Sequence, residues 1–129
     1  MHEKQFKGKE GESVAEQVLL AKGLKILHRN WRAGKNEVDI IARHNDLIVF
    51  VEVKTRATRH FGNPSEMVSR KQRNNILKAA NQFSLEGQSE SISMRFDIIS
   101  VLYTGQEVEA EHIEDAFYPE ANQLKNILC

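Results

Sequence analysis

Cysteine is nearly absent from this chain of 129 residues, which contains Cys129 alone and only two prolines. A single thiol cannot form an intrachain disulfide, so a fold held together by disulfides is excluded. Zinc clusters built on several cysteines are excluded for the same reason. Such cysteine usage is typical of a reducing compartment, and we expect a cytoplasmic protein.

Long hydrophobic runs are also missing. The apolar stretches fall far short of the about 20 residues that a membrane-spanning helix needs. The initial segment MHEKQFKGKEGE is charged and lacks the apolar part of a signal peptide. We therefore expect no membrane association. The composition, with 40% hydrophobic and 28% charged residues, is that of a globular protein, and the length predicts a single domain over residues 1–129.

Neither sign of charge is in excess, because 18 Lys and Arg residues balance 18 Asp and Glu residues. Their distribution is uneven: residues 54–78 hold seven basic residues and one acid, whereas residues 105–120 hold six acids and no Lys or Arg. This asymmetry can hide an anion-binding surface, although taken alone it is better explained by two solvated faces. The histidines lack a metal-ligand spacing such as H-E-x-x-H, and no glycine-rich loop implies ATP.

Hydrophobic periodicity predicts two helices. Apolar residues recur at helical spacing in residues 10–22, and Gly23 is placed to end that helix. A second helix is predicted over residues 65–83, with Ser65 as its N-cap. Its apolar stripe consists of Ile76, Leu77, Ala80 and Phe83.

Four segments rich in β-branched and other apolar residues are predicted strands. They are residues 24–31, 36–43, 47–55 and 94–103. The turn composition of residues 44–46 joins the second and third strands into an antiparallel hairpin. Residues 112–117 are expected to form at most a short closing helix. The order α-β-β-β-α-β predicts one sheet flanked by helices, an α/β or α+β sandwich.

Two charged residues, Glu52 and Lys54, interrupt the most hydrophobic of these strands. Because side chains alternate across a strand, both point to the same face. Folding the hairpin about its turn brings Asp39 opposite Glu52, or nearly so, within roughly 5.5 Å between Cβ atoms. Two close carboxylates repel one another and are costly to bury, and a divalent cation such as Mg²⁺ relieves that repulsion. An ordinary ion pair on a solvated face is the weaker alternative, because both faces of this strand are apolar.

A third acid, Glu12, borders the buried stripe of the first predicted helix. Taken alone, it is better explained as a first-turn acid that the helix dipole favours. The combination is more specific. An aspartate and an E-x-K motif lie on paired strands, with a Glu-bearing helix before them and a basic helix after them.

These residues resemble the PD-(D/E)xK nuclease superfamily, which includes restriction endonucleases and archaeal Holliday-junction resolvases. The segments GESVAEQVLLAKG, NEVDIIAR, VFVEVKTR, FGNP, RFDIISV and HIEDAF resemble more closely a small uncharacterised bacterial family, the YraN-like proteins. That resemblance runs nearly end to end. It implies a restriction endonuclease-like α-β-β-β-α-β core with a central mixed sheet, in agreement with the residue patterns.

The resemblance implies a role for each matching residue. Asp39 and Glu52 become the metal carboxylates and Lys54 the catalytic lysine. Glu12 matches the helix-one acid of the resolvase-like branch, and Lys71 and Gln72 match an auxiliary polar position on the second helix.

Two positions depart from the patterns. Val38 stands where the superfamily has proline, and Asn36 stands where the small family usually has glycine, which affects the turn before the strand. Glu37 has no clear role in the superfamily and ranks below Glu12.

These observations predict a metal-dependent endonuclease that acts on DNA phosphodiester bonds. Mg²⁺, or Mn²⁺, is expected on Asp39, Glu52 and the backbone carbonyl of Val53, with Glu12 directly or through water. Lys54 is expected to orient the attacking water or to offset negative charge. The expected nucleic-acid contacts are Arg56, Arg70, Lys71, Gln72 and Arg73. No segment resembles a base-reading element such as a recognition helix or zinc finger, which predicts selectivity for the shape of a junction, flap or end rather than for sequence.

Two alternatives remain open. The first is a nucleic-acid-binding module with the nuclease fold and weak or absent catalysis, acting beside a protein partner in DNA metabolism. The second is an interaction protein whose acidic segment docks a basic partner or a second copy of the chain. Divalent-metal binding separates them from the enzyme, because only catalysis requires it.

Overall fold

The computed structural model describes residues 2–57, 68–88 and 93–118, with residues 2–9, 87 and 88 described by their backbone alone. The described elements begin with α1 (His2–Ala21) and three strands, β1 (Lys25–Ala33), β2 (Asn36–His44) and β3 (Leu47–Arg56). They continue with α2 (Arg70–Phe83), a π-helical turn (Ser84–Gln88), β4 (Ser93–Thr104) and β5 (Glu107–Phe117). None of the helices in these ranges has the length and apolar character needed to cross a bilayer.

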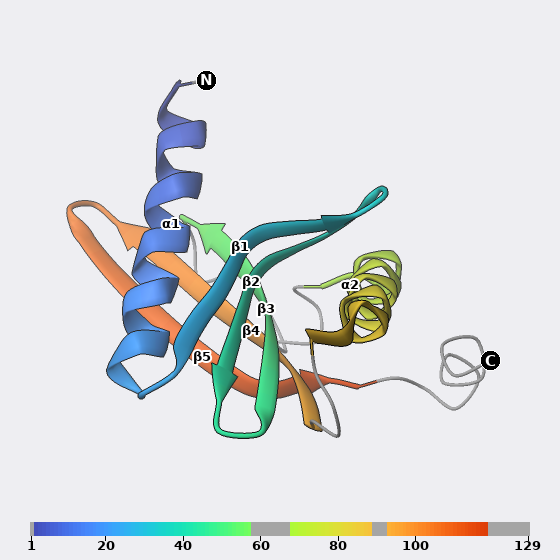
Figure 1. The fold of residues 1–129 in the computed structure, drawn as a ribbon. Helices are drawn as coiled ribbons and strands as arrows, with labels where there is room; N and C mark the ends of the chain where they lie inside the picture. The colour runs from blue at the N-terminus through green and yellow to red at the C-terminus, as the bar shows by residue number, and fades with distance from the viewer. Residues whose placement is uncertain (1, 58–67, 89–92, 119–129) are drawn as a thin grey trace.

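The five strands form one mixed sheet in the order β1-β2-β3-β4-β5 (Figure 1). Neighbouring strands are antiparallel except for β3 and β4, which run parallel. A parallel pair needs a long crossover connection, and α2 lies within that connection. The predicted α/β fold with a mixed sheet flanked by helices is confirmed.

Each face of the sheet has its own hydrophobic core, because successive residues of β3 point to opposite sides. Ile48 and Phe50 pack with the apolar residues of α2, including Phe83. Val49 and Val51 pack instead with the residues of α1, including Leu19. The helices therefore cover opposite faces, and β3 is buried from both sides. Glu52 and Lys54 share the α2 side with Phe50.

Helix α1 is longer than its hydrophobic periodicity predicts. The helix begins at His2 rather than at residue 10. Residues 2–9 are mostly good helix formers, which allows the helix to extend over them. They contain only one large apolar residue, Phe6, so they have no hydrophobic periodicity that would predict a helix. Its end is as expected: Gly23 has a φ of +88°, the left-handed conformation that glycine adopts readily. Gly11 brings α1 against the end of β3, since a Cβ at this position would collide with Thr55 Oγ1.

The start of α2 differs from the prediction. The helix begins at Arg70 with Ser69 as its N-cap, and Ser69 and Gln72 form a reciprocal capping box. Ser65, the predicted cap, lies outside the described residues, as does most of the predicted loop 56–64. The four predicted stripe residues of this helix are all buried.

The predicted closing helix at residues 112–117 is wrong. These residues belong to β5, which pairs antiparallel with β4 from Thr104↔Glu107 to Phe96↔Phe117. The segment 107–111 is exposed and rich in acids, as is common at the edge of a sheet, where charge opposes further strand pairing. The order of elements is therefore α-β-β-β-α-β-β.

Candidate functional site

The β2–β3 hairpin brings Asp39 and Glu52 together. Its pairs run without a bulge from His44↔Leu47 to Ile40↔Val51, and the same register places Asp39 beside Glu52. Beyond the last pair, the backbone N–H of Val53 donates a hydrogen bond of 2.8 Å to Asp39 Oδ2. The Asp39 side chain thus takes the place of a backbone partner and is fixed to the strand that carries Glu52.

Both carboxyl groups are buried enough to change their ionisation. The side chain of Glu52 is 15% exposed. Burial and the neighbouring charge of Asp39 raise the pKa of Glu52 to about 8. Burial also raises the pKa of Asp39, although the hydrogen bond from Val53 opposes the rise. At neutral pH the pair therefore retains a proton that two separate, solvated carboxyl groups would have lost.

Lys54 lies next to this pair. Its Nζ is 3.7 Å from Glu52 Oε1, and its side chain is 26% exposed. The ammonium opposes the rise in the pKa of Glu52, but burial and Asp39 outweigh it. Among Asp39, Glu52 and Lys54, one cation faces two carboxyl groups, so this group of side chains favours a further positive charge.

A pocket of about 190 Å³ opens over the carboxyl pair. Asp39, Glu52 and Glu37 line one wall. Gln72, Asn75 and Ile76 of α2 form the opposite wall, and Lys35 lies at the β1–β2 turn. The capping box fixes Gln72, because its side chain accepts a bond of 3.1 Å from the Ser69 backbone N–H.

Two further residues line this pocket: Glu37, which the sequence ranked below Glu12, and Asn75, which the sequence did not single out. Glu37 shares the pocket and its charge raises the pKa of both Asp39 and Glu52, while its Oε2 lies 3.3 Å from Arg32 Nη2. The alternation along β2 already places Glu37 on the face of Asp39. Asn75 follows Gln72 by three positions, the spacing of neighbours on one helix face.

Glu12 lies on α1, across the sheet from α2. Because α1 begins at His2, Glu12 is in the middle of the helix, and the explanation as a first-turn acid is wrong. Burial and the charge of Asp39 raise the pKa of Glu12, so the two acids influence one another. In the described part of the chain, however, no three His, Cys, Asp or Glu side chains form a ready-made metal cluster. Glu12 is therefore near Asp39 without joining it in such a cluster.

The expected phosphate contacts fall into two groups. Arg70 and Lys71 are exposed at the start of α2, and Arg73 is half-buried there. Arg56 is half-buried, and its Nε donates a bond of 2.8 Å to Ser100 Oγ on β4. Part of the hydrogen-bonding capacity of Arg56 is thus used within the sheet.

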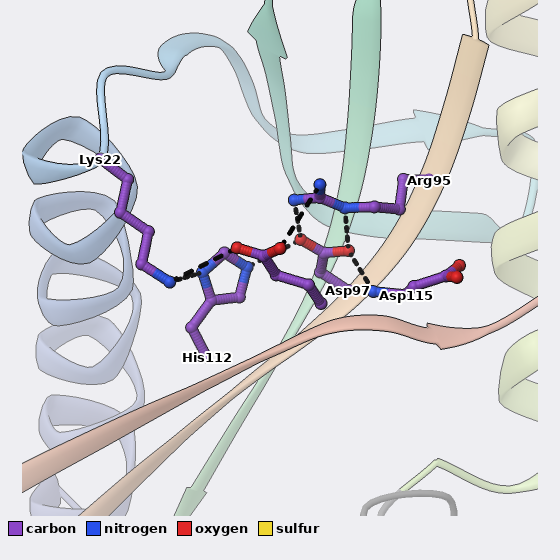
Figure 2. A network of polar contacts seen from close by, with 6 residues as sticks. Lys22, Arg95, Asp97, His112 and Asp115 are labelled. Carbon is purple, nitrogen blue, oxygen red and sulfur yellow. Dashed lines mark hydrogen bonds and ion pairs between the residues drawn. The ribbon is translucent and has the colours of Figure 1, made fainter.

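A second polar network lies on β4, and the residue patterns did not reveal it (Figure 2). The side chain of Asp97 is fully buried and accepts two bonds of 2.8 Å from Arg95. It also contacts His112 Nε2 at 2.7 Å and accepts a bond from the Asp115 backbone N–H. Lys22 Nζ lies 2.9 Å from His112 Nδ1. An ammonium can only donate, so Nδ1 is the acceptor and Nε2 carries the proton donated to Asp97.

This network connects the end of α1 to β4 and β5. It lies on the α1 face, since Asp97 alternates with Phe96 and Ile98 of the other core. It therefore supports the sheet from the side opposite the carboxyl pair. Asp97 could have been found in the sequence as an acid between the apolar residues of a strand, the same pattern that singled out Glu52.

Residues 11–101 match the model of the uncharacterised protein family UPF0102. The chain belongs to this family. A UPF0102 protein of Phocaeicola vulgatus is 42% identical over 112 residues, which cover 87% of this chain and 92% of the relative. A UPF0102 protein of Christiangramia forsetii is 42% identical over 111 residues, or 86% and 92% of the two chains. The resemblance to the YraN-like family is thereby confirmed.

The UPF0102 match includes Glu12, Asp39, Glu52 and Lys54 but ends before β5. Among solved structures, the chain is similar to SfsA of Pyrococcus furiosus in complex with Ca²⁺, with 14% sequence identity and a TM-score of 0.44. The similarity covers 86% of this chain and 63% of the SfsA chain. A TM-score this low does not establish a common fold.

Proposed function

We propose that this UPF0102 protein is a metal-dependent nuclease that hydrolyses phosphodiester bonds, with DNA as its substrate. The observation that supports this most strongly is the half-buried Asp39–Glu52 pair, with Lys54 beside Glu52 on the same strand. The resemblance of this D-x(12)-E-x-K pattern to the PD-(D/E)xK superfamily points in the same direction. Structure-dependent rather than sequence-dependent selectivity fits a sequence in which no segment resembles a recognition helix or a zinc finger.

The donor set suits Mg²⁺ or Mn²⁺. Two half-buried carboxyl groups with raised pKa values lie side by side, and a divalent cation can replace the proton that they retain. Mg²⁺ is usually held by one or two carboxylates together with waters and substrate phosphate oxygens, so Asp39 and Glu52 suffice as its side-chain ligands. The Val53 carbonyl would complete the protein ligands, and Glu12 would act through water. Such an ion, when bound, lowers the pKa of a water molecule and offsets charge on the phosphate.

The other steps, orienting the ligands and binding the substrate, fall to side chains and backbone groups of this chain. Val53 holds Asp39 Oδ2 through its N–H, which keeps the aspartate in one orientation. Lys54 offsets the charge that develops on the phosphodiester or orients the attacking water, from a position that the strand fixes. Arg70, Lys71 and Arg73 at the start of α2 attract the backbone of the substrate, a contact that carries no sequence information.

One observation favours a second candidate, a nucleic-acid-binding module without turnover. The described residues contain no three-residue cluster of metal-ligating side chains, so the protein supplies fewer ligands than a closed metal site would. In that case the pair would still fix the hairpin, and the basic residues of α2 would bind nucleic acid.

A cleavage assay separates the two. Purified wild type is incubated with Mg²⁺ or Mn²⁺ on four-way junctions, flaps, single strands and plasmid, as DNA and as RNA. We expect cleavage that requires the metal, and a loss of at least about 100-fold in Asp39→Asn and in Lys54→Ala. Asp46→Asn, an exposed acid in the same hairpin, is the matched control and retains activity. Equal cleavage by wild type and both site variants would identify a contaminant and overturn the proposal.

A further inference from the structure

A second and larger pocket lies along the same helix, α2, as the pocket of the candidate site. It has a volume of about 480 Å³ and lies between the β1–β2 turn and the C-terminal part of α2. Its lining consists of Ala33, Gly34, Asn36, Lys78, Gln82 and Glu86. Nothing in the family match or in the proposed chemistry assigns a role to it.

The two pockets follow one another along α2. The first is bordered by Gln72 and Asn75, and the second by Lys78 and Gln82, which continue the same side of the helix at spacings of three and four residues. Across from α2, Asn36 lines the second pocket and Glu37 the first. In Figure 1 the β1–β2 hairpin extends on the side of the sheet where α2 lies. The two pockets therefore lie one after the other along α2, the first at the carboxyl pair and the second towards the end of the helix.

The pockets differ in what they can hold. At about 190 Å³ the first is smaller than typical small-molecule pockets of about 300–1,000 Å³, and it accommodates a phosphate group and its ions. The second, at about 480 Å³, lies within that range. The described residues of its lining supply one ammonium, two side-chain amides and one carboxylate. Among the described residues Lys78 has no ion-pair partner, whereas Gln82 Nε2 lies 3.3 Å from Glu86 Oε2.

We propose that this second pocket binds one unpaired nucleotide of the strand whose phosphodiester lies at Asp39 and Glu52, with Lys78 on its phosphate. The inference rests on the proposed function for the identity of the ligand. The amides of Asn36 and Gln82 each offer a donor and an acceptor, as base edges do. A paired base is enclosed in the stack and cannot enter a pocket, so the nucleotide is unpaired. Glu86 at the far end repels a further phosphate, so the bound strand ends there.

The substrate class follows from this arrangement. A nucleic acid with an unpaired strand next to the cleaved bond, such as a flap or a single-stranded end, satisfies both pockets. A continuous blunt duplex satisfies only the first. The protein is therefore expected to prefer unpaired strands to duplex.

Binding in the absence of divalent cations tests the inference without requiring cleavage. The affinities of wild type, Lys78→Ala and Gln82→Ala for a fluorescent single-stranded oligonucleotide and for a blunt duplex are measured by anisotropy at several salt concentrations. Loss of one phosphate contact weakens single-strand binding about fivefold at 0.1 M salt and reduces the salt slope by about 0.7. Lys25→Ala, at the opposite end of β1 and also exposed, is the matched control.

We expect Lys78→Ala to lose affinity and salt dependence for the single strand. Gln82→Ala is expected to lose affinity with an unchanged salt slope, because the amide is neutral. Equal behaviour of Lys78→Ala and Lys25→Ala, or wild-type binding to blunt duplex as tight as to the single strand, overturns the inference. If the wild type cuts DNA but Lys78→Ala binds the single strand normally, nucleotide binding by the second pocket is refuted and the proposed nuclease activity is not. If the wild type cuts no substrate but Lys78→Ala binds the single strand more weakly, the nuclease activity is refuted and nucleotide binding by the second pocket is not.

Discussion

Val53 and Asp39 are joined by a backbone-to-side-chain hydrogen bond of 2.8 Å at the point where the β2–β3 ladder stops pairing. The bond orients one carboxylate oxygen of Asp39 and holds the group against Glu52. Both acids are thus mounted on strands, which hold a constellation more rigidly than loops do. The consequences of this arrangement are open to measurement.

The raised pKa of Glu52 predicts how stability varies with pH. The folded protein retains a proton between pH 4.5 and about 8 that the unfolded chain has lost. Stability therefore falls as pH rises through this window, by up to about 1.4 kcal/mol per pH unit from this group. Urea denaturation at a series of pH values, without divalent metal, measures the effect. Glu52→Gln should lack this contribution and gain stability relative to wild type above about pH 8, and parallel curves for the two proteins would contradict the assignment.

Asp97 predicts the opposite dependence. Burial alone would raise its pKa, but hydrogen bonds from His112, Arg95 and the Asp115 N–H hold the pKa below the ordinary value of 3.8. The lowered pKa of Asp97 stabilises the folded protein, and this contribution is fully present above pH 3.8. The contribution is lost as the pH falls below 3.8 and through the lower pKa of the folded state. Asp97→Asn breaks a buried charged network, and we expect a loss of about 3–5 kcal/mol at pH 7 that shrinks in acid.

The matched control for Asp97 is Glu107→Gln, an exposed acid of the adjacent strand. Urea denaturation should show a change of less than about 0.5 kcal/mol for it. Equal midpoints for the two variants would show that the network does not stabilise the fold.

The capping box of α2 predicts a smaller loss of stability than the Asp97 network, confined to the start of this helix. Ser69→Ala removes the acceptor for the Gln72 backbone N–H, and we expect a loss of about 1 kcal/mol in the free energy of unfolding. Ser13→Ala, at an exposed position inside α1, should leave stability unchanged or slightly raised because alanine favours helix. If both variants behave alike, Ser69 is not the cap.

Much of the site could be predicted from the sequence because its geometry is local. The two-residue turn at Asn45 and Asp46 and an unbulged ladder allow Asp39 and Glu52 to be aligned by counting from the turn. The alternation of β3 then places Lys54 on the face of Glu52. The helix over 70–83 was also predictable from its stripe, and its start from the Ser69-x-x-Gln72 pattern of a capping box, which the expected cap Ser65 lacks. Ser65 and Ser69 are both suitable caps, and only the capping box with Gln72 distinguishes them.

Other features depend on contacts between distant segments. β5 pairs with β4 on one side only, and its first five residues are all exposed and hold three acids, so they lack the apolar content by which the other strands were predicted. Because this strand was not predicted, His112 had no expected partner, and the role of Asp97 could not be foreseen. The wall formed by Gln72 and Asn75 similarly depends on how α2 packs across β2.

The central claim is that Asp39 and Glu52 together bind a divalent cation, and calorimetric titration with Mg²⁺ tests it most directly. We predict that the wild type binds Mg²⁺ and that Asp39→Asn and Glu52→Gln each lose binding, while Asp46→Asn binds as wild type does. Binding that is absent from the wild type, or unchanged in both site variants, would contradict the account.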